Sequence, residues 1–497
     1  MQLALESIPD VASTRGQRAQ ATPWWGACAA VGAVSGALVF LGTHRALIDD
    51  SYITLDYART LAQHGQWALV PGHQANTATS PLNVLLLAGL IVLTSAPVVS
   101  VGILLIIALA VTGAALSVIC TRLGRSPWLA AMAVSLLVLN PLLISTIGLE
   151  TYLAIALIAA LGAAVVLRRP MVTGAVCGLL VLTRADLAAF ALAALVVVTA
   201  RSPVSTRLRQ VGYVTGVAGI ITLPWFAASW WWLGSAVPDT LLFKVTETWV
   251  GNSFAVGLWH YELSFPLAVG LSVLPAAIGL IVLAAGNVGG VRPRVGTAEM
   301  LVMVWGLGAV LHLTVFLLLR PPPYHWYYGP AIGALTMLAA LGIGQHSHRL
   351  QWAGSTIGVL FIAATVVFLA TRPWAVMPIS TNWASPAQYA ALAARAPSGS
   401  TVKAFGEVGT VAYFCDCTVV DRFSDRAQVA DLLRAKRSTA GPVARTLLDW
   451  NYYRFKTGPP VHADYEFAFA EDPTGIAVTS WRPYAGKMVV QRANAVG

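Results

Sequence analysis

Charged residues are scarce in this sequence of 497 residues, and their scarcity excludes a large class of proteins. Only 10% of the residues are charged and 57% are apolar, whereas charged residues make up about a quarter of an ordinary soluble domain. The mean hydropathy of +0.70 exceeds what one soluble core can bury, so lipid must solvate much of the surface. The sequence therefore predicts a polytopic α-helical membrane protein and excludes an ordinary cytosolic enzyme.

Cysteines are also few, and nucleotide- and zinc-binding motifs are missing. The five cysteines form no CxxC pair with the spacing of a zinc site, and neither common glycine-rich nucleotide-binding loop occurs. Cys28, Cys120 and Cys177 lie in apolar runs, where we expect them to be packing residues. Cys415 and Cys417 could form a tight disulfide in an exported domain. Soluble nucleotide chemistry is therefore not supported.

Charge is distributed unevenly along the chain. Residues 372–497 carry 24 of the 52 charged residues, and the apolar runs end just before them. We therefore predict a cytoplasmic N-terminal tail over residues 1–24 and a transmembrane module over 25–371, with a first outer loop at 45–80. A small extracytoplasmic α/β domain is predicted over 372–497.

Apolar runs of about 17 to 25 residues can cross the hydrocarbon core of a membrane as helices. The sequence contains eleven candidate runs, near 25–44, 81–121, 127–146, 149–167, 171–184, 186–200, 211–233, 262–287, 299–320, 327–345 and 354–371. The second run is too long for one straight helix and is interrupted around Thr94–Pro97, so we expect a juxtamembrane or re-entrant piece and one span there. The runs near 171–200 are short and split by Arg184 and Asp186.

Basic residues predict the orientation of these helices, because Lys and Arg near the ends of spans favour the cytoplasm. With the N-terminus inside, twelve of the seventeen basic residues before residue 372 lie at cytoplasmic ends, and the odd number of spans places the C-terminal domain outside. Their position in short loops explains the net charge of +10 without a nucleic-acid partner. The protein is thus predicted to be a multi-pass protein of the plasma membrane.

Acidic residues before residue 372 gather at the predicted outer face. Eight of eleven lie there, namely Asp49, Asp50, Asp56, Glu150, Asp186, Asp239, Glu247 and Glu262. Acids have little influence on topology, so this distribution indicates a polar site at the outer surface. The alternative is that outer loops simply need polar residues.

The first predicted outer loop opens with two adjacent carboxylates. Asp49 and Asp50 directly follow an apolar run, where burial and mutual repulsion raise the pKa of one of them unless a cation is near. Residues 51–63 have apolar side chains at helical spacing, which predicts an amphipathic helix lying on the membrane. Asp50 could simply cap this helix, but the long polar stretch after it, which includes His73, favours catalysis.

The order of motifs along the chain resembles that of the GT-C glycosyltransferases, which are membrane enzymes that use polyprenyl-phosphate sugars. Within them, the chain is most similar to the actinobacterial terminal arabinofuranosyltransferases of cell-wall arabinan. The segments that carry the resemblance are Asp49–Arg59, Pro71–Gly72, Thr79–Leu82, Gly148–Thr151, Leu182–Asp186 and Gly234–Lys244. Ala185 replaces a usual proline and Asp239 a usual asparagine.

This resemblance implies transfer of a sugar, with arabinofuranose favoured, from a polyprenyl-phosphate donor to a hydroxyl of a cell-envelope polysaccharide or glycolipid. A mannosyltransferase of the same class is an alternative. An alternative of another class is a lipid or glycolipid flippase, which would also need polar residues within the membrane. Such a transporter predicts inverted repeats that meet at the middle of the bilayer, and we find no repeat in the sequence.

The resemblance also implies that an acid of the first outer loop is the general base, and both Asp50 and Asp49 match its position, with Asp50 slightly favoured. The other aspartate could orient the base or bind a divalent cation together with Glu150, and the metal is left unassigned. Cations near the outer face are the candidates for binding the donor phosphate. They are Arg45, Arg59, Arg184, Lys244 and Arg320.

Several of these candidates have a structural alternative. Arg45 and Lys244 could equally be interfacial residues whose charge reaches the membrane surface, and Arg184 could equally form a buried ion pair with Asp186. The aromatic segment after Arg320 suits sugar binding, although an interfacial aromatic belt is the alternative. The candidate substrate-binding residues are Glu150, Asp186, His73, Tyr324, His325, Tyr327 and Tyr328.

The predicted C-terminal domain alternates strand-like and helical segments. The expected strands are Thr401–Phe405, Thr410–Phe414, Thr418–Val420, Ile476–Ser480 and Met488–Gln491, and the expected helix is Ala427–Lys436. Such an α/β module could cover the active site or bind a polymeric acceptor. Glu407 and Asp421 are expected to be ordinary surface or turn residues.

Overall fold

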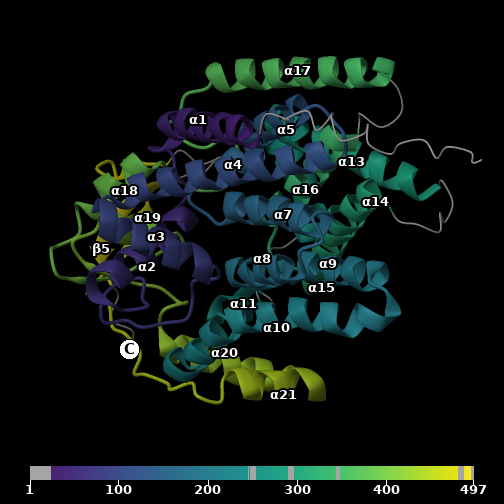
Figure 1. Cartoon of the computed structure of the whole chain (residues 1–497). Coiled ribbons are helices and arrows are strands. Elements are labelled where there is room, and N and C mark those ends of the chain that lie inside the picture. Colours follow the sequence, from purple (N-terminus) through teal and green to yellow (C-terminus); the bar gives the residue numbers. More distant parts are fainter. Residues whose placement is uncertain are drawn as a thin grey trace, which may run out of the picture.

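The computed structural model of the chain describes residues 24–244, 246, 253–288, 296–342, 348–478 and 486–493. Helices make up most of this part of the chain, and many of the long ones lie roughly parallel (Figure 1). Four of the described helices are long and apolar enough to cross a membrane, and seven shorter ones are also apolar. The prediction of a mostly helical chain with several membrane-length helices is confirmed. Residues 1–23 of the predicted tail and Glu247 lie outside the described residues.

Most helices before residue 372 follow the predicted apolar runs. They are α1 (Trp25–Thr43), α2 (Asp49–His64), α3 (Pro81–Thr94), α4 (Pro97–Arg122), α5 (Trp128–Val138), α6 (Pro141–Ile144), α7 (Thr151–Val166), α8 (Pro170–Thr183), α9 (Ala188–Arg201), α10 (Val204–Ala228), α11 (Asp239–Lys244), α12 (Phe254–Ser264), α13 (Pro266–Val288), α14 (Thr297–Leu301), α15 (Gly308–Leu319), α16 (Gly329–Gly342) and α17 (His348–Ala370). Short 3-10 or π-helical segments join or extend them: η1 (Ala185–Leu187), η2 (Ser229–Leu233), η3 (Val302–Leu307) and η4 (His325–Tyr327).

The predicted interruption of the second apolar run is present. Helix α3 ends at Thr94, and its C-cap residue Ser95 has a left-handed φ of 54°. Pro97 then begins α4. Proline is favoured at the start of a helix because it has no backbone N–H, and an N–H in the first turn would have no acceptor within the helix. The expected split near residues 184–186 is also present, because η1 separates α8 from α9.

Glycines allow the first membrane-length helix to approach another closely. A Cβ added at Gly32 of α1 would lie 2.2 Å from the carbonyl oxygen of Leu109 in α4, and one at Gly113 of α4 would lie 2.2 Å from that of Cys28. Small residues of this kind let helix backbones meet within a membrane. The free cysteines Cys28, Cys120 and Cys177 are buried.

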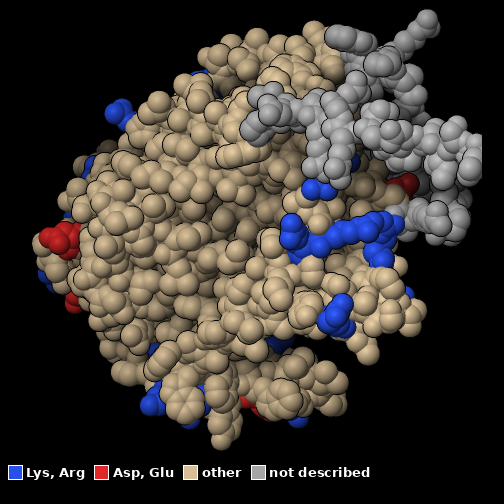
Figure 2. Space-filling model, viewed as in Figure 1, with Lys and Arg blue, Asp and Glu red and all other residues tan. Residues whose placement is uncertain are grey.

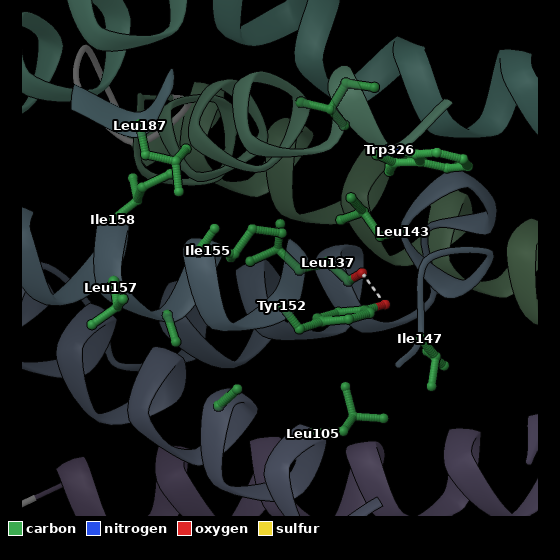
Figure 3. Close-up of a cluster of buried hydrophobic side chains, with 14 of the residues drawn as sticks. Leu105, Leu137, Leu143, Ile147, Tyr152, Ile155, Leu157, Ile158, Leu187 and Trp326 are labelled. Atoms are coloured by element: carbon green, nitrogen blue, oxygen red, sulfur yellow. Dashed lines mark hydrogen bonds between the residues drawn. The ribbon is translucent and has the colours of Figure 1, made fainter. Parts of the chain in front are cut away.

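A buried apolar core connects α4, α5, α6 and α7. Tyr152 of α7 lies in this core with Leu105, Leu143 and Ile155, and Figure 3 shows the side chains around it. Its hydroxyl lies 3.4 Å from the carbonyl oxygen of Leu137, at which it donates a hydrogen bond. The loop that follows α6 packs against this core through Ile147.

The helix predicted over residues 51–63 is present as α2, but it does not lie on the surface. Tyr52, Leu55 and Ala58 are buried, and so are Asp56 and Thr60. Both α3 and α19 (Gly409–Phe414) pack against α2. Helix α2 is therefore internal, because a segment about 360 residues later in the chain covers it.

Residues 401–492 include a five-stranded mixed sheet in the order β2-β1-β3-β5-β4. Strand β1 pairs in parallel with β2 and β3, whereas β5 pairs antiparallel with β3 and β4. The strands are β1 (Thr401–Lys403), β2 (Thr418–Val420), β3 (Tyr465–Ala470), β4 (Ile476–Ala477) and β5 (Lys487–Arg492). The accompanying helices are α18 (Pro386–Ala393), α19, α20 (Arg426–Thr439) and α21 (Pro442–Asn451). A disulfide joins Cys415 to Cys417.

One expected strand is a helix. Residues 410–414, predicted as a strand, belong to α19. A carboxylate from the start of α2 binds the backbone N–H groups at the beginning of this segment, and such an interaction stabilises the start of a helix. The strand prediction was wrong because this carboxylate comes from a distant part of the chain.

Charged side chains are sparse on the face that Figure 2 shows. Basic side chains gather toward one end of the molecule, where the turns from α7 to α8 and from α9 to α10 lie (Figures 1 and 2). Arg168 and Arg169 occupy the first of these turns, and Arg201 ends α9. Helices α2, α18 and α19 and strand β5 lie at the opposite end (Figure 1).

Candidate active site

The two adjacent aspartates form the first turn of α2. Ile48 is the N-cap residue of this helix, with an extended backbone, so Asp50 does not cap it. Carboxylates in a first turn are stabilised by the partial positive charge of the helix N-terminus. The helix ends at His64, and its C-cap residue Gly65 has a φ of 65°, which suits glycine.

A cavity of about 1580 Å³ lies where the start of α2 meets the chain after residue 372. Its volume exceeds the roughly 300–1,000 Å³ of a typical small-molecule pocket. Polar lining residues from the helical part include Asp49, Asp50, Glu150, Lys244 and Tyr324, and those from the later part include Asn382, Lys403, Glu407, Asp421, Arg422 and His462. The cavity is therefore built by both parts of the chain.

The carboxylate of Asp49 binds three backbone N–H groups. Its Oδ2 accepts the N–H groups of Val408 and Gly409 at 3.0 and 3.2 Å, and its Oδ1 accepts that of Thr410 at 2.7 Å. Burial raises the pKa of Asp49, although these hydrogen bonds oppose the rise. Asp49 thus ties α2 to α19.

Asp50 lies on the cavity wall, where it is half-buried. Burial raises its pKa to about 7, the charge of Lys244 opposes this rise, and the charges of Asp49 and Glu150 add to it. A carboxyl group with a pKa near neutrality suits proton transfer at physiological pH. Asp50 is therefore a candidate base on the cavity wall, whereas the carboxylate of Asp49 is occupied by three backbone N–H groups.

Lys244 ends α11 and reaches the same cavity. Its Nζ lies 5.2 Å from the ring centroid of Tyr324 and 5.5 Å from that of Tyr327. Burial lowers the pKa of Lys244, but interactions with Tyr327 and Asp50 outweigh that effect and the pKa is raised. A charged ammonium group therefore stands on the cavity wall within the field of Asp50.

Arg184 is held by two carboxylates behind this wall. Its Nη1 lies 2.9 Å from Glu150 Oε1, and its Nε lies 2.9 Å from Asp186 Oδ1. The other oxygen of Asp186 lies 3.3 Å from Nδ1 of His312, an interaction that is ionic only when the imidazole is protonated. The structure thus shows the ion-pair alternative for Arg184, extended to Glu150, and Glu150 also lines the cavity.

The remaining candidate cations lie elsewhere. Arg59 pairs with Asp56 at 2.9 Å and donates a hydrogen bond to the carbonyl oxygen of Tyr413. Arg45 and Arg320 are exposed, His73 is half-buried, and none of these three lines the cavity. Of the five predicted phosphate-binding residues, Lys244 is the one that the structure places on the cavity wall.

The aromatic segment after α15 contributes unevenly to the site. Tyr324 and Trp326 stack with ring centroids 4.6 Å apart, and both line the cavity. His325 is buried with Nε2 at 3.2 Å from the carbonyl oxygen of Ser145. Tyr327 and Tyr328 are also buried, and the Tyr328 hydroxyl donates to the carbonyl oxygen of Phe254. His325 and Tyr328 therefore support the wall from behind.

Two acids that the sequence analysis set aside line the cavity. Glu407 accepts the backbone N–H of Trp383 at 3.0 Å, and burial, followed by the charge of Asp49, raises its pKa well above the usual range. Asp421 forms the expected turn by accepting the backbone N–H of Ser424 at 2.7 Å. The expectation of an ordinary surface residue was wrong for Glu407. No local signal marks it, because its neighbours at the site come from a distant segment.

The site combines a carboxyl group, a fixed ammonium group and stacked aromatic rings. These groups can take a proton from a hydroxyl and bind an anionic phosphate. Among the residues that the structure describes, no three His, Cys, Asp or Glu side chains are grouped so that they could hold a metal ion.

Comparison with known proteins identifies the fold. No family model matches the chain, and no curated protein matches it in sequence. The structure of ArnT from Cupriavidus metallidurans in the apo state is 15% identical, with a TM-score of 0.55 over 95% of this chain and 98% of ArnT. ArnT from the same organism bound to undecaprenyl phosphate is 14% identical, with a TM-score of 0.52 over 96% and 99% of the two chains. The chain therefore has the fold of ArnT along nearly its whole length.

Proposed function

We propose that this protein is a GT-C glycosyltransferase that moves a sugar from a polyprenyl-phosphate donor to a hydroxyl of a cell-envelope polysaccharide or glycolipid. The observation that carries this proposal is the presence of Asp50 and Lys244 on the wall of one cavity. The fold supports it, because ArnT with the same fold binds undecaprenyl phosphate, and a polyprenyl phosphate is the leaving group of such a donor.

In the proposed reaction, the acceptor hydroxyl oxygen attacks the anomeric carbon of the donor sugar. A bond forms between these two atoms while the bond from the anomeric carbon to the phosphate oxygen breaks. The hydroxyl proton passes to the carboxylate of Asp50, and the polyprenyl phosphate leaves with the electron pair. The ammonium group of Lys244 stabilises the charge on the leaving phosphate.

The other candidate residues have supporting roles in this proposal. Asp49 holds α19 against the start of α2 and so positions Asp50. Glu150, Arg184 and Asp186 form the ionic support behind the wall. Tyr324 and its stacked partner Trp326 offer an aromatic surface to a sugar ring.

We further propose that arabinofuranose is the transferred sugar and that the cavity opens on the extracytoplasmic side of the plasma membrane. The resemblance of the sequence motifs to terminal arabinofuranosyltransferases supports the sugar. The lopsided distribution of basic and acidic residues supports the orientation.

Reconstituted full-length protein tests this function. Decaprenyl-phosphate arabinose and decaprenyl-phosphate mannose are each offered with a cell-envelope glycan extract, and release of decaprenyl phosphate and labelling of the glycan are measured. We expect arabinose transfer by the wild type and loss of transfer in Asp50→Asn.

The same experiment distinguishes the alternatives. Labelling of the glycan from the mannose donor alone would show that the protein transfers mannose and not arabinofuranose. The proposed class of reaction would remain the same. Movement of the intact lipid across the vesicle bilayer, without breakage of the donor, would show a flippase and overturn the proposal.

A further inference from the structure

Helix α21 presents large apolar side chains on its surface. Val443 is 76% exposed, Trp450 is 71% exposed, and Tyr453 just beyond the helix is 75% exposed. Val443, Leu447 and Trp450 are separated by four and three residues, so they share one face of the helix. Arg445 lies on the opposite face. A contiguous apolar face of this kind marks an interaction surface.

The end of α21 is attached to a membrane-length helix. The indole N–H of Trp230 in η2 donates to the carbonyl oxygen of Trp450 at 2.8 Å, and its ring stacks on that of Tyr453. Asn451 Oδ1 accepts the backbone N–H groups of Ala236 and Val237 at 3.0 and 2.9 Å. These contacts fix α21 at the place where α10 and η2 end (Figure 1).

The apolar surface continues from α21 onto that membrane-length helix. Residues 204–233 form an apolar helix of 30 residues, of which very little is buried by the rest of the protein. Its exposed side chains include Ile220, Leu223 and, at the end near α21, Trp232. Lipid is the solvent that such a helix requires, and Trp residues are enriched where a span meets the membrane surface.

Basic side chains lie beside these tryptophans and beside α21. The guanidinium carbon of Arg454 lies 3.7 Å from the ring centroid of Trp231, and Lys436 and Arg437 lie in the last turn of α20. Arg437 is paired with Asp449 of α21 at 2.8 Å. Cations beside an apolar helical face are typical of helices that bind a membrane surface with anionic lipid.

We propose that α21 is an interfacial membrane helix, with Val443, Leu447 and Trp450 in contact with phospholipid acyl chains and Arg445 facing water and lipid phosphates. The continuity with the lipid-facing helix α10 identifies phospholipid as the occupant of this face. This inference does not depend on the proposed reaction.

Helix α20 connects the proposed membrane helix α21 to the wall of the cavity. Val429 and Leu433 of α20 form a small apolar cluster with Leu242 and Phe243 of α11. Helix α11 ends at Lys244 on the cavity wall. Binding of α21 to the bilayer therefore holds the support of this lysine at a constant depth.

Site-specific quenching tests the proposal on the full-length protein. Leu447→Cys and the opposite-face control Arg445→Cys are each labelled with a bimane fluorophore, and the unsubstituted protein gives the background from the buried native cysteines. The proteins are reconstituted in vesicles of equal parts phosphatidylcholine and phosphatidylglycerol. We expect brominated phosphatidylcholine to quench the label at 447 roughly fivefold more than the label at 445, and aqueous iodide to show the reverse order.

Three outcomes would overturn the proposal. Equal quenching of both labels by iodide would place the face of α21 in water. Protection of the label at 447 from both quenchers would show that protein covers the face, and cross-linking at 447 would then identify a second copy as the occupant. If Leu447→Cys fails to fold, Val443→Cys on the same face takes its place, and strong iodide quenching there would also reject the membrane contact.

Discussion

The Oδ1 of Asp49 accepts a hydrogen bond from the backbone N–H of Thr410 at 2.7 Å. The residues thus joined are 361 positions apart in the chain. Two further N–H groups of the same segment bind the other carboxylate oxygen of Asp49. Because the carboxylate of Asp49 already binds three backbone N–H groups, we assign proton transfer to its neighbour Asp50.

Replacement of Asp50 tests this assignment most directly. Asp50→Asn keeps the size of the side chain but cannot accept the acceptor proton, so we expect the rate of sugar transfer to fall about 10²- to 10⁴-fold. The unfolding temperature in detergent should match that of the wild type. Transfer at the wild-type rate, with a properly folded variant, would exclude Asp50 as the base.

Asp49→Asn should act mainly on stability. It removes a charge-assisted interaction with three backbone N–H groups, which we expect to lower the free energy of unfolding by about 1.5–3 kcal/mol. Part of the transfer activity should remain at low temperature, where the variant stays folded. A stable Asp49→Asn protein with no activity would instead give Asp49 the chemical role.

Gly409→Ala should disturb the same contact from the other side. The added Cβ would lie 2.3 Å from the carbonyl oxygen of Asp49 and 2.5 Å from the backbone nitrogen of Ile53, so α19 must move away from α2. We expect faster proteolysis after residue 372 and a lower unfolding temperature. Gly458→Ala is the matched control, since its Cβ would meet only a contact at 4.0 Å. Equal behaviour of the two variants would show that the α2–α19 contact is loose.

The pH dependence of transfer follows from the pKa of Asp50, which burial raises to about 7. Only the ionised carboxylate can accept a proton, so kcat/KM should rise with pH and reach half of its plateau near pH 7. Lys244 opposes the rise in this pKa, and Lys244→Met should therefore move the half-point to higher pH. A profile that stays flat between about pH 5 and pH 9 would contradict the assignment.

Lys244 should also determine donor binding. Lys244→Met should raise the KM for the polyprenyl-phosphate sugar and lower kcat, because the charge on the phosphate grows as the bond breaks. Arg45→Met is the matched control, since Arg45 is exposed and lies outside the cavity lining. If Arg45→Met raised the donor KM more than Lys244→Met does, the phosphate would bind near Arg45 and not in the cavity.

Arg184→Ala should destabilise the protein rather than change donor affinity selectively. The substitution leaves the carboxylates of Glu150 and Asp186 without their shared cation, and breaking a buried pair of this kind costs about 3–5 kcal/mol. Arg320→Ala, at an exposed position, should change stability by less than about 0.5 kcal/mol. If Arg184→Ala were as stable as the wild type and had a raised KM for the donor, Arg184 would instead be a phosphate-binding residue.

Local patterns in the sequence were sufficient to predict most of the helices before residue 372. Apolar runs predicted most helices before residue 372, and the break before Pro97 was visible because proline and a turn residue interrupt a run locally. The adjacent carboxylates of Asp49 and Asp50 also drew attention to a segment that lines the cavity, because charged residues beside a span are costly and need a reason.

The tertiary structure alone decided which of these residues meet. It brought Glu407 to the cavity, gave Arg184 the second partner Glu150, and placed Arg45 and Arg320 away from the cavity. It also turned residues 410–414 into a helix, since the carboxylate that binds the first N–H groups of that helix belongs to Asp49. Periodicity and composition depend on neighbours in the chain, whereas burial, ion pairing and pKa depend on neighbours in space, and these become fixed only when the chain folds.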